Sequence, residues 1–146
     1  MRRRVSAIVS LCLCSVACSL PATTFEAYRA KAADAALEVV SQARTAILVS
    51  HLDGRDRLLS SSVAVQLRDA EKAAATAVAA FGSVQPPDAR ADHLRARILP
   101  QLERASDAIA RMRFEATRDD TAALLRLRSS LIDPAGALER WAETVA

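Results

Sequence analysis

The chain has 146 residues, of which 51% are hydrophobic and 3% aromatic, and its formal net charge at pH 7 is +3. Three of its 20 basic residues, Arg2, Arg3 and Arg4, lie together at the start, so the rest of the chain balances 17 basic against 17 acidic side chains. A chain without excess positive charge gives no basis for a nucleic-acid partner, and we expect none.

The first 17 residues have the layout of a signal peptide. The short basic segment is followed by an uncharged run, residues 5–18. This run is shorter than the roughly 20 apolar residues that span a membrane, and Pro21 follows it closely, so a retained anchor helix is the weaker interpretation. We therefore predict a signal peptide at residues 1–17 and export of the remaining 129 residues.

A cysteine stands directly after the predicted cleavage position. Residues 15–18, Ser-Val-Ala-Cys, resemble the bacterial lipobox, although Ser15 replaces the Leu that this pattern prefers. The chain has three cysteines, Cys12, Cys14 and Cys18. None follows Cys18, so a disulfide framework in the exported part is excluded and acylation explains the position of Cys18 better. We predict a lipid on Cys18 and a short tether at residues 18–23, with secretion without a lipid as the alternative.

From residue 24 onward, apolar residues recur at the three- and four-residue spacing of amphipathic helices, and no segment has the pattern of a strand. The predicted helices cover approximately residues 24–52, 62–81, 88–118 and 120–145. The residues expected to face the interior are Phe25, Tyr28, Ala32, Ala35, Val39, Ala43, Ala46 and Ser50; Val63, Leu67, Ala70, Ala74, Ala77 and Phe81; Ala91, Leu94, Ile98, Leu102, Ala105, Ile109, Met112 and Ala116; and Leu124, Leu127, Leu131, Leu138, Trp141 and Val145.

Local signals indicate where these helices begin and restart. Thr23 and Glu26 have the spacing of a capping box at the start of the first helix. Asp88 is the expected N-cap of the third helix. Asp133, followed by Pro134 in a position that tolerates proline, should restart the fourth helix.

Four such helices joined by short links predict an all-α fold, an antiparallel up-down-up-down four-helix bundle over residues 24–146 that is preceded by the signal sequence. The start of the first helix, the turn at residues 85–87 and the C-terminus then share one end. The loop at residues 53–61 and the turn at residues 118–120 share the other. The five residues 19–23 span at most about 18 Å, so a lipid on Cys18 would hold the first end close to the membrane.

The sequence offers little for catalysis or metal binding. His51 and His93, the only histidines, are predicted at opposite ends of the bundle, roughly 30 Å apart, and cannot share a metal site. Haem ligation by Met112 and His51 is a weaker alternative to Met112 as a core side chain. The chain has no Gly-x-Ser-x-Gly motif and only three glycines. We predict no enzyme activity, no metal and no cofactor.

Five arginines recur every seven residues along the third predicted helix: Arg90, Arg97, Arg104, Arg111 and Arg118. A seven-residue step drifts only about 20° on a straight helix, so this arginine flank extends for about 42 Å beside the inward stripe. Such side chains usually cover the core with their methylene stems and pair with acids, and Asp107 and Arg111 have the spacing of a pair. Arg97 and Arg104 have no acid four residues away. The flank is therefore a candidate site for an anionic ligand, a lipid headgroup or an acidic partner.

Three stretches of the chain carry a resemblance to a known group. Together with the lipobox-like leader, residues 24–32, 44–46 and 81–88 resemble uncharacterised small lipoproteins and exported helical proteins of GC-rich Gram-positive bacteria. The resemblance covers nearly the whole chain through weakly specific motifs. It implies a location and a helical fold, but no mechanism.

These observations favour a non-enzymatic lipoprotein at the outer face of the cytoplasmic membrane. Its expected role is that of an interaction or accessory module for an envelope protein, with the membrane contacted through the lipid on Cys18. The alternative is a freely secreted helical protein that binds an anionic ligand or acidic partner through the arginine flank.

Overall fold

The computed structural model describes residues 22–145 as four α-helices, and that part of the chain contains no strand. The helices are α1 (Phe25–Asp53), α2 (Ser60–Ser83), α3 (Ala89–Ala116) and α4 (Thr121–Val145). They confirm the all-helical class, and their ends differ from the predicted ones by no more than two residues. The predicted signal peptide and Cys18 lie outside the described residues.

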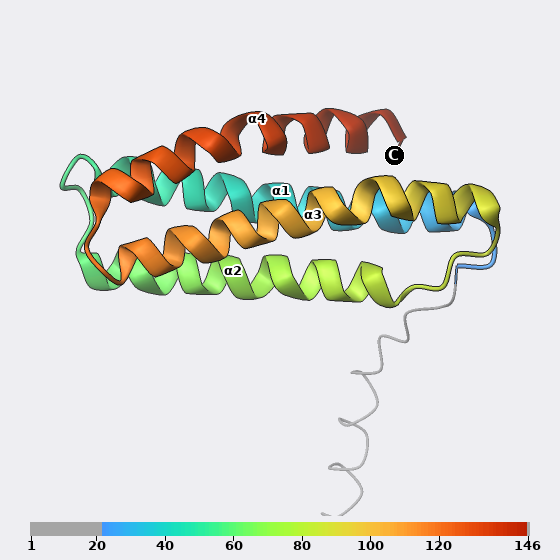
Figure 1. The fold of residues 1–146 in the computed structure, drawn as a ribbon, viewed down its shortest axis with the longest axis horizontal. Helices are drawn as coiled ribbons and strands as arrows, with labels where there is room; N and C mark the ends of the chain where they lie inside the picture. Colours follow the sequence, from blue (N-terminus) through green and yellow to red (C-terminus); the bar gives the residue numbers. More distant parts are fainter. Residues whose placement is uncertain (1–21, 146) are drawn as a thin grey trace, which may run out of the picture.

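The helices lie side by side, and consecutive helices run in opposite directions (Figure 1). Helix α1 packs against each of the other three, and α3 also packs against α2 and α4. Within residues 22–145, α2 and α4 do not approach each other. The bundle is therefore flattened along one diagonal, and α1 and α3 form its shared middle. None of the described helices is long and apolar enough to cross a membrane.

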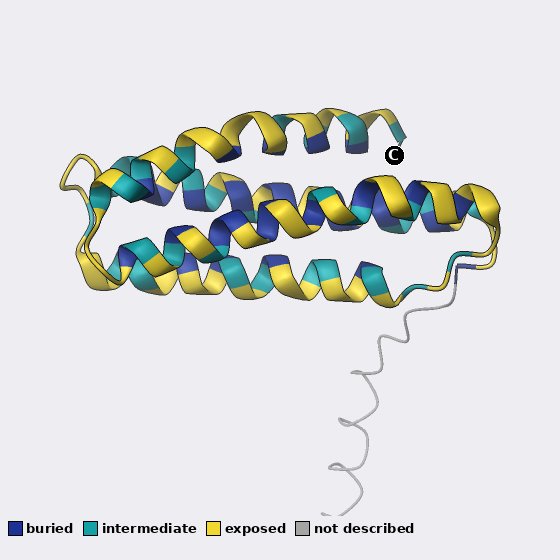
Figure 2. Ribbon diagram, viewed as in Figure 1, coloured by how far each residue is buried: buried dark blue, intermediate teal, exposed yellow. Residues whose placement is uncertain are grey.

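The interior is built from the predicted stripes of the first three helices. All eight stripe residues of α3 are buried, as are those of α1 except Phe25 and those of α2 except Ala77. Figure 2 shows buried residues on the inward faces of the helices and exposed residues on the outward faces. The 3.6-residue period of the apolar residues therefore identifies the buried face correctly.

Helix α4 departs further from its predicted stripe. Leu124, Leu131 and Leu138 are buried, but the other three predicted residues, Leu127, Trp141 and Val145, are only half-buried. Two alanines, Ala135 and Ala142, are buried in addition. The buried face of α4 therefore lies nearer to these small side chains than the large apolar residues suggested.

The first helix begins one residue later than the capping box requires. Thr24 is the N-cap, and its hydroxyl accepts a hydrogen bond from the Ala27 backbone N–H at 3.2 Å. The predicted pairing of Thr23 with Glu26 is wrong, and Glu26 instead forms an ion pair with Arg29 at 2.8 Å. The physical reason is that either threonine can supply the capping oxygen, and the helix starts after the second.

The other two predicted start signals have different outcomes. Asp88 caps α3 as predicted, with its Oδ1 accepting a hydrogen bond from the Ala91 N–H at 2.9 Å. The predicted restart at Asp133 is wrong, because α4 continues without interruption through Pro134. A proline within a helix removes one N–H donor and bends the helix without having to end it. Figure 1 shows α4 bowed along its length.

The two turn regions are fixed by contacts between helices. At the end where α2 passes to α3, the Arg95 guanidinium donates a hydrogen bond to the Gly82 carbonyl at 2.6 Å, which satisfies one of the last carbonyls of α2. At the opposite end, Gly54 has an ordinary φ of −63°. A Cβ at this position would lie 3.1 Å from Leu125 Cδ2, so any larger residue here would require the Leu125 side chain to shift by a few tenths of an ångström.

Tyr28 is fully buried, and its ring packs against Phe81 with 5.4 Å between the ring centroids. Its hydroxyl has no hydrogen-bond partner among the described residues. Burial raises the pKa of Tyr28 above the ordinary value of 10.0, Arg95 opposes this shift, and Asp92 adds to it. The neutral phenol is therefore the form that the fold stabilises, and its contribution is lost as the pH rises through the folded-state pKa.

We expect Tyr28→Phe to leave the free energy of unfolding at pH 7 unchanged or to raise it by about 1 kcal/mol, because it removes a buried polar group without a partner. The decrease in stability above about pH 10 should be smaller in the variant than in the wild type. Urea denaturation at both pH values measures this difference. Tyr28 is the only tyrosine, so no other phenol contributes. If Tyr28→Phe lowered the free energy of unfolding at pH 7, the Tyr28 hydroxyl would have to make a stabilising hydrogen bond, contrary to the structure.

Candidate functional site

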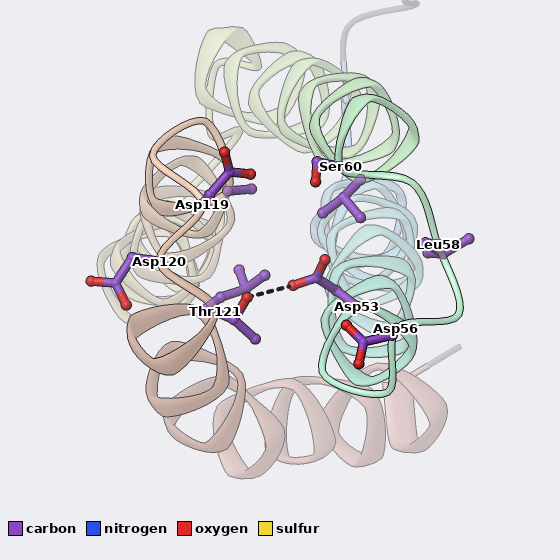
Figure 3. A pocket seen from close by; sticks show the side chains of 10 residues that line it. Asp53, Asp56, Leu58, Ser60, Asp119, Asp120 and Thr121 are labelled. Carbon is purple, nitrogen blue, oxygen red and sulfur yellow. Dashed lines mark hydrogen bonds between the residues drawn. The ribbon is translucent and has the colours of Figure 1, made fainter.

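An acidic hollow of about 200 Å³ lies where the α1–α2 loop meets the α3–α4 turn. Four aspartates line it: Asp53, Asp56, Asp119 and Asp120. Figure 3 shows Asp53 directed toward Thr121, whose hydroxyl donates a hydrogen bond to Asp53 Oδ2 at 3.3 Å. The Ala123 N–H donates to Asp120 Oδ1 at 2.8 Å and so caps α4. These two carboxylates therefore stabilise the turn and the helix start.

The other two aspartates of the hollow have an unusual backbone conformation. Asp56 and Asp119 have φ angles of 53° and 54°, in the left-handed region that aspartate adopts more readily than most residues. Among residues 22–145, no group of three His, Cys, Asp or Glu side chains is arranged to hold a metal ion. The hollow is therefore formed where two tight turns meet.

The two histidines lie at opposite ends of the bundle, as predicted. His51 is in the last turn of α1, and its Nδ1 lies 3.0 Å from Arg128 Nη1 on α4. A guanidinium can only donate, so Nδ1 must be the accepting nitrogen of the imidazole. His93 is exposed near the start of α3. Met112 is fully buried in the core, the position expected for a packing side chain.

All five residues of the arginine flank are exposed. None lies within 4.0 Å of a carboxylate oxygen in the described part of the chain. The predicted pair of Asp107 and Arg111 is not formed, which fits the small free energy gained by exposed ion pairs. Asp69 on α2 lies 3.6 Å from Arg68 of the same helix.

The flank does not form one uniform surface. The Arg90 guanidinium lies 4.1 Å from the centre of the Phe25 ring, and that of Arg118 lies 5.4 Å from the centre of the Phe114 ring. The aromatic rings therefore engage the two ends of the flank through cation–π contacts. The three arginines between these ends have neither an aromatic nor a carboxylate partner among the described residues.

Other arginines make the interhelical ion pairs. Arg113 on α3 binds Glu71 on α2 through Nε and also through Nη2, the latter at 3.5 Å. Arg44 on α1 binds Glu139 on α4 at 2.5 Å. No sequence signal marks these pairs, because they depend on how far one helix is shifted along another. Glu71 and Glu139 therefore pair with arginines outside the flank.

A cleft of about 410 Å³, which we call the α3–α4 cleft, lies between α3 and α4. Its apolar lining consists of Ala105 on α3 and of Leu131, Pro134 and Leu138 on α4. Its polar lining consists of Gln101, Arg104 and Arg111 on α3 and Ser130 on α4. Two arginines of the flank are therefore brought to one apolar-floored cleft.

A second groove lies between α1 and α2 and has a volume of about 540 Å³. Alanines of α2 form much of it, and charged residues of both signs line it: Glu38, Asp69 and Lys72. A smaller hollow of about 270 Å³, which shares Glu38, Ala77 and Ala80 with this groove, extends toward Phe81 and adds Lys31 and Asp34. Charges of both signs are therefore mixed along this groove.

Comparison with known proteins gives one partial match. The family model described as "Leucine rich repeat N-terminal domain" is similar to residues 118–146, about a fifth of the chain. This segment contains α4, which packs against α1 and α3 as part of the bundle. No curated protein and no solved structure matches the chain. A match of this extent does not assign the protein to a family.

The contrast between paired and unpaired arginines predicts different effects on stability. We expect Arg113→Gln to lower the free energy of unfolding by about 1 kcal/mol, a value that allows for the partial exposure of the pair. Arg97→Gln, the matched control on the same helix, should change it by less than about 0.5 kcal/mol. Chemical denaturation compares the two. A loss for Arg97→Gln equal to that for Arg113→Gln would show that the flank has a structural role.

Proposed function

We propose that the protein is an exported, non-enzymatic helical bundle that is preceded by a signal sequence and anchored by a lipid on Cys18. In this proposal it stands at the outer face of the cytoplasmic membrane and acts as an interaction or accessory module for an envelope protein. The observation that carries the proposal is how soon the folded part begins after Cys18.

Ala22 is 5% exposed and belongs to the core, and Thr24 already caps α1. Only four residues of chain lead from Cys18 to Ala22, and they span at most about 14 Å. A lipid on Cys18 would therefore hold the start of α1 next to the membrane. The opposite end, with the α1–α2 loop and the α3–α4 turn, would point away from it.

We expect Cys18→Ala to move the protein from the membrane fraction to the culture medium, because the bundle then lacks its lipid. Fractionation of cells that produce the wild type and the variant measures this. Far-ultraviolet circular dichroism of the released variant should show an unchanged helical bundle, since Cys18 precedes Ala22 and the α1 N-cap at Thr24 in the chain. Membrane retention of the variant would contradict lipid anchoring.

The second candidate function is that of a freely secreted protein that binds an anionic ligand or acidic partner. The observation that favours it is the lack of carboxylate partners along the arginine flank within the described residues. Unneutralised guanidinium groups attract anions, and this attraction is screened by salt.

This candidate predicts salt-sensitive binding to a polyanion such as heparin. Elution from a heparin column should need less salt after Arg97→Glu combined with Arg104→Glu, because two attractive charges become repulsive. The control is Arg55→Glu combined with Arg57→Glu, which makes the same charge change in the exposed α1–α2 loop. Equal effects of the two double variants would show attraction to net charge alone.

A further inference from the structure

We propose that the α3–α4 cleft binds a single-chain aliphatic carboxylate, with the aliphatic body on the apolar floor and the carboxylate on the guanidinium groups of Arg104 and Arg111. The proposal deepens the second candidate function, because it assigns that anionic ligand a chemical class and a place. It does not depend on whether Cys18 carries a lipid.

The size and floor of the cleft suit an aliphatic chain. Its volume of about 410 Å³ falls within the range of small-molecule sites, and such sites combine an apolar lining with a few polar groups. Ala105, Leu131 and Leu138 are each no more than 2% exposed and close the bottom of the cleft, so Pro134 is the exposed apolar lining residue that an aliphatic chain can contact. Arg104 and Arg111 are seven residues apart, or about 10 Å along the helix axis, a separation that two long arginine side chains can bridge to reach one carboxylate.

The rim of the cleft selects the charge of the ligand. Both guanidinium groups belong to exposed side chains without a carboxylate within 4.0 Å among residues 22–145. No acidic residue lines the cleft, in contrast to the α1–α2 groove with its mixed charges. Guanidinium and carboxylate form short, often bidentate, charge-assisted hydrogen bonds. An amphiphile with a negative head and an apolar body therefore matches both parts of the site.

Pro134 explains why a cleft exists at this point of the bundle. Proline lacks the N–H that would bond the carbonyl four residues earlier, which is that of Ser130, and its ring displaces the helix there. Ser130 and Pro134 both line the cleft, and α4 is bowed along its length in Figure 1. Opposite them, Ala105 has a small side chain that leaves the space unfilled.

The test measures binding of decanoate to the bundle by isothermal titration calorimetry, at concentrations below those at which decanoate forms micelles. Trp141 provides a second signal, because it is the only tryptophan and lies three residues beyond Leu138, half-buried on α4. We expect saturable binding of decanoate with a change in tryptophan fluorescence. Decanol, which has the same chain without the charge, should bind at least tenfold more weakly.

Matched variants separate the cleft from the flank as a whole. Arg104→Glu combined with Arg111→Glu should weaken decanoate binding by tenfold to about a hundredfold, since charge-assisted hydrogen bonds are replaced by repulsion. Arg90→Glu combined with Arg97→Glu makes the same charge change on the same flank but outside the cleft, and it should leave binding within about twofold, because exposed charges at that distance are screened.

A third variant tests the apolar part of the site. Ser130 is exposed and lines the cleft, so Ser130→Phe should fill the space without disturbing the core and should abolish decanoate binding. Circular dichroism and thermal melting confirm that each variant is folded. The loss of binding must therefore occur in a folded bundle.

Three results would overturn the proposal. Equal weakening by the two double arginine variants would show diffuse attraction to the flank, which supports the second candidate function but not the cleft. If decanol bound as tightly as decanoate, the arginines would not contribute to recognition of the ligand. Failure to bind decanoate, with or without binding to vesicles of anionic phospholipid, would show that the cleft is no site for a free aliphatic acid.

Discussion

The close approach of α1 to its neighbours is the constraint on which the rest of the bundle depends. Ala32, Ala36, Ala43 and Ala46 are fully buried along α1 and leave room for three other helices to contact it. Because most buried side chains of α1 are small, larger ones from the other three helices, such as Leu67, Leu102 and Leu138, fill much of the interior. This division explains how a chain with 3% aromatic residues still encloses a packed core.

The helical periodicity of the sequence predicts most of the fold, and interhelical geometry accounts for the rest. The stripe of α3 is entirely correct because its large apolar residues recur without interruption. Helix α4 was predicted less well, since Ala135 and Ala142 are buried where the pattern favoured larger side chains. Thr23 and Thr24 can both act as an N-cap, so the sequence did not decide between two starts of α1 one residue apart. Asp133 followed by Pro134 has the sequence pattern of a helix start, although α4 is continuous there.

The candidate site could be predicted only in part for a related reason. The seven-residue spacing placed the arginines on one flank, and the local sequence showed that Arg97 and Arg104 have no acid four residues away. The path of α4 past Pro134 determines that Arg104 and Arg111 border the cleft. This path cannot be predicted from local sequence patterns. The bond between Arg113 and Glu71 likewise joins residues 42 positions apart and requires the relative shift of two helices.

The position of α1 in the chain has a consequence for how the bundle assembles. Synthesis proceeds from the N-terminus, so α1, one of the two helices that contact all the others, is made before any of its neighbours. The apolar stripe of α1 stays exposed until α2 has been made. The side of α1 that packs against α4 stays exposed until α4, the last of the four helices in the chain, has been made. Contacts between the first and last helices also give the fold more non-local contacts than a chain of successive hairpins would have. During synthesis the nascent chain therefore presents a long alanine-rich surface, which small side chains make less adhesive than leucines would.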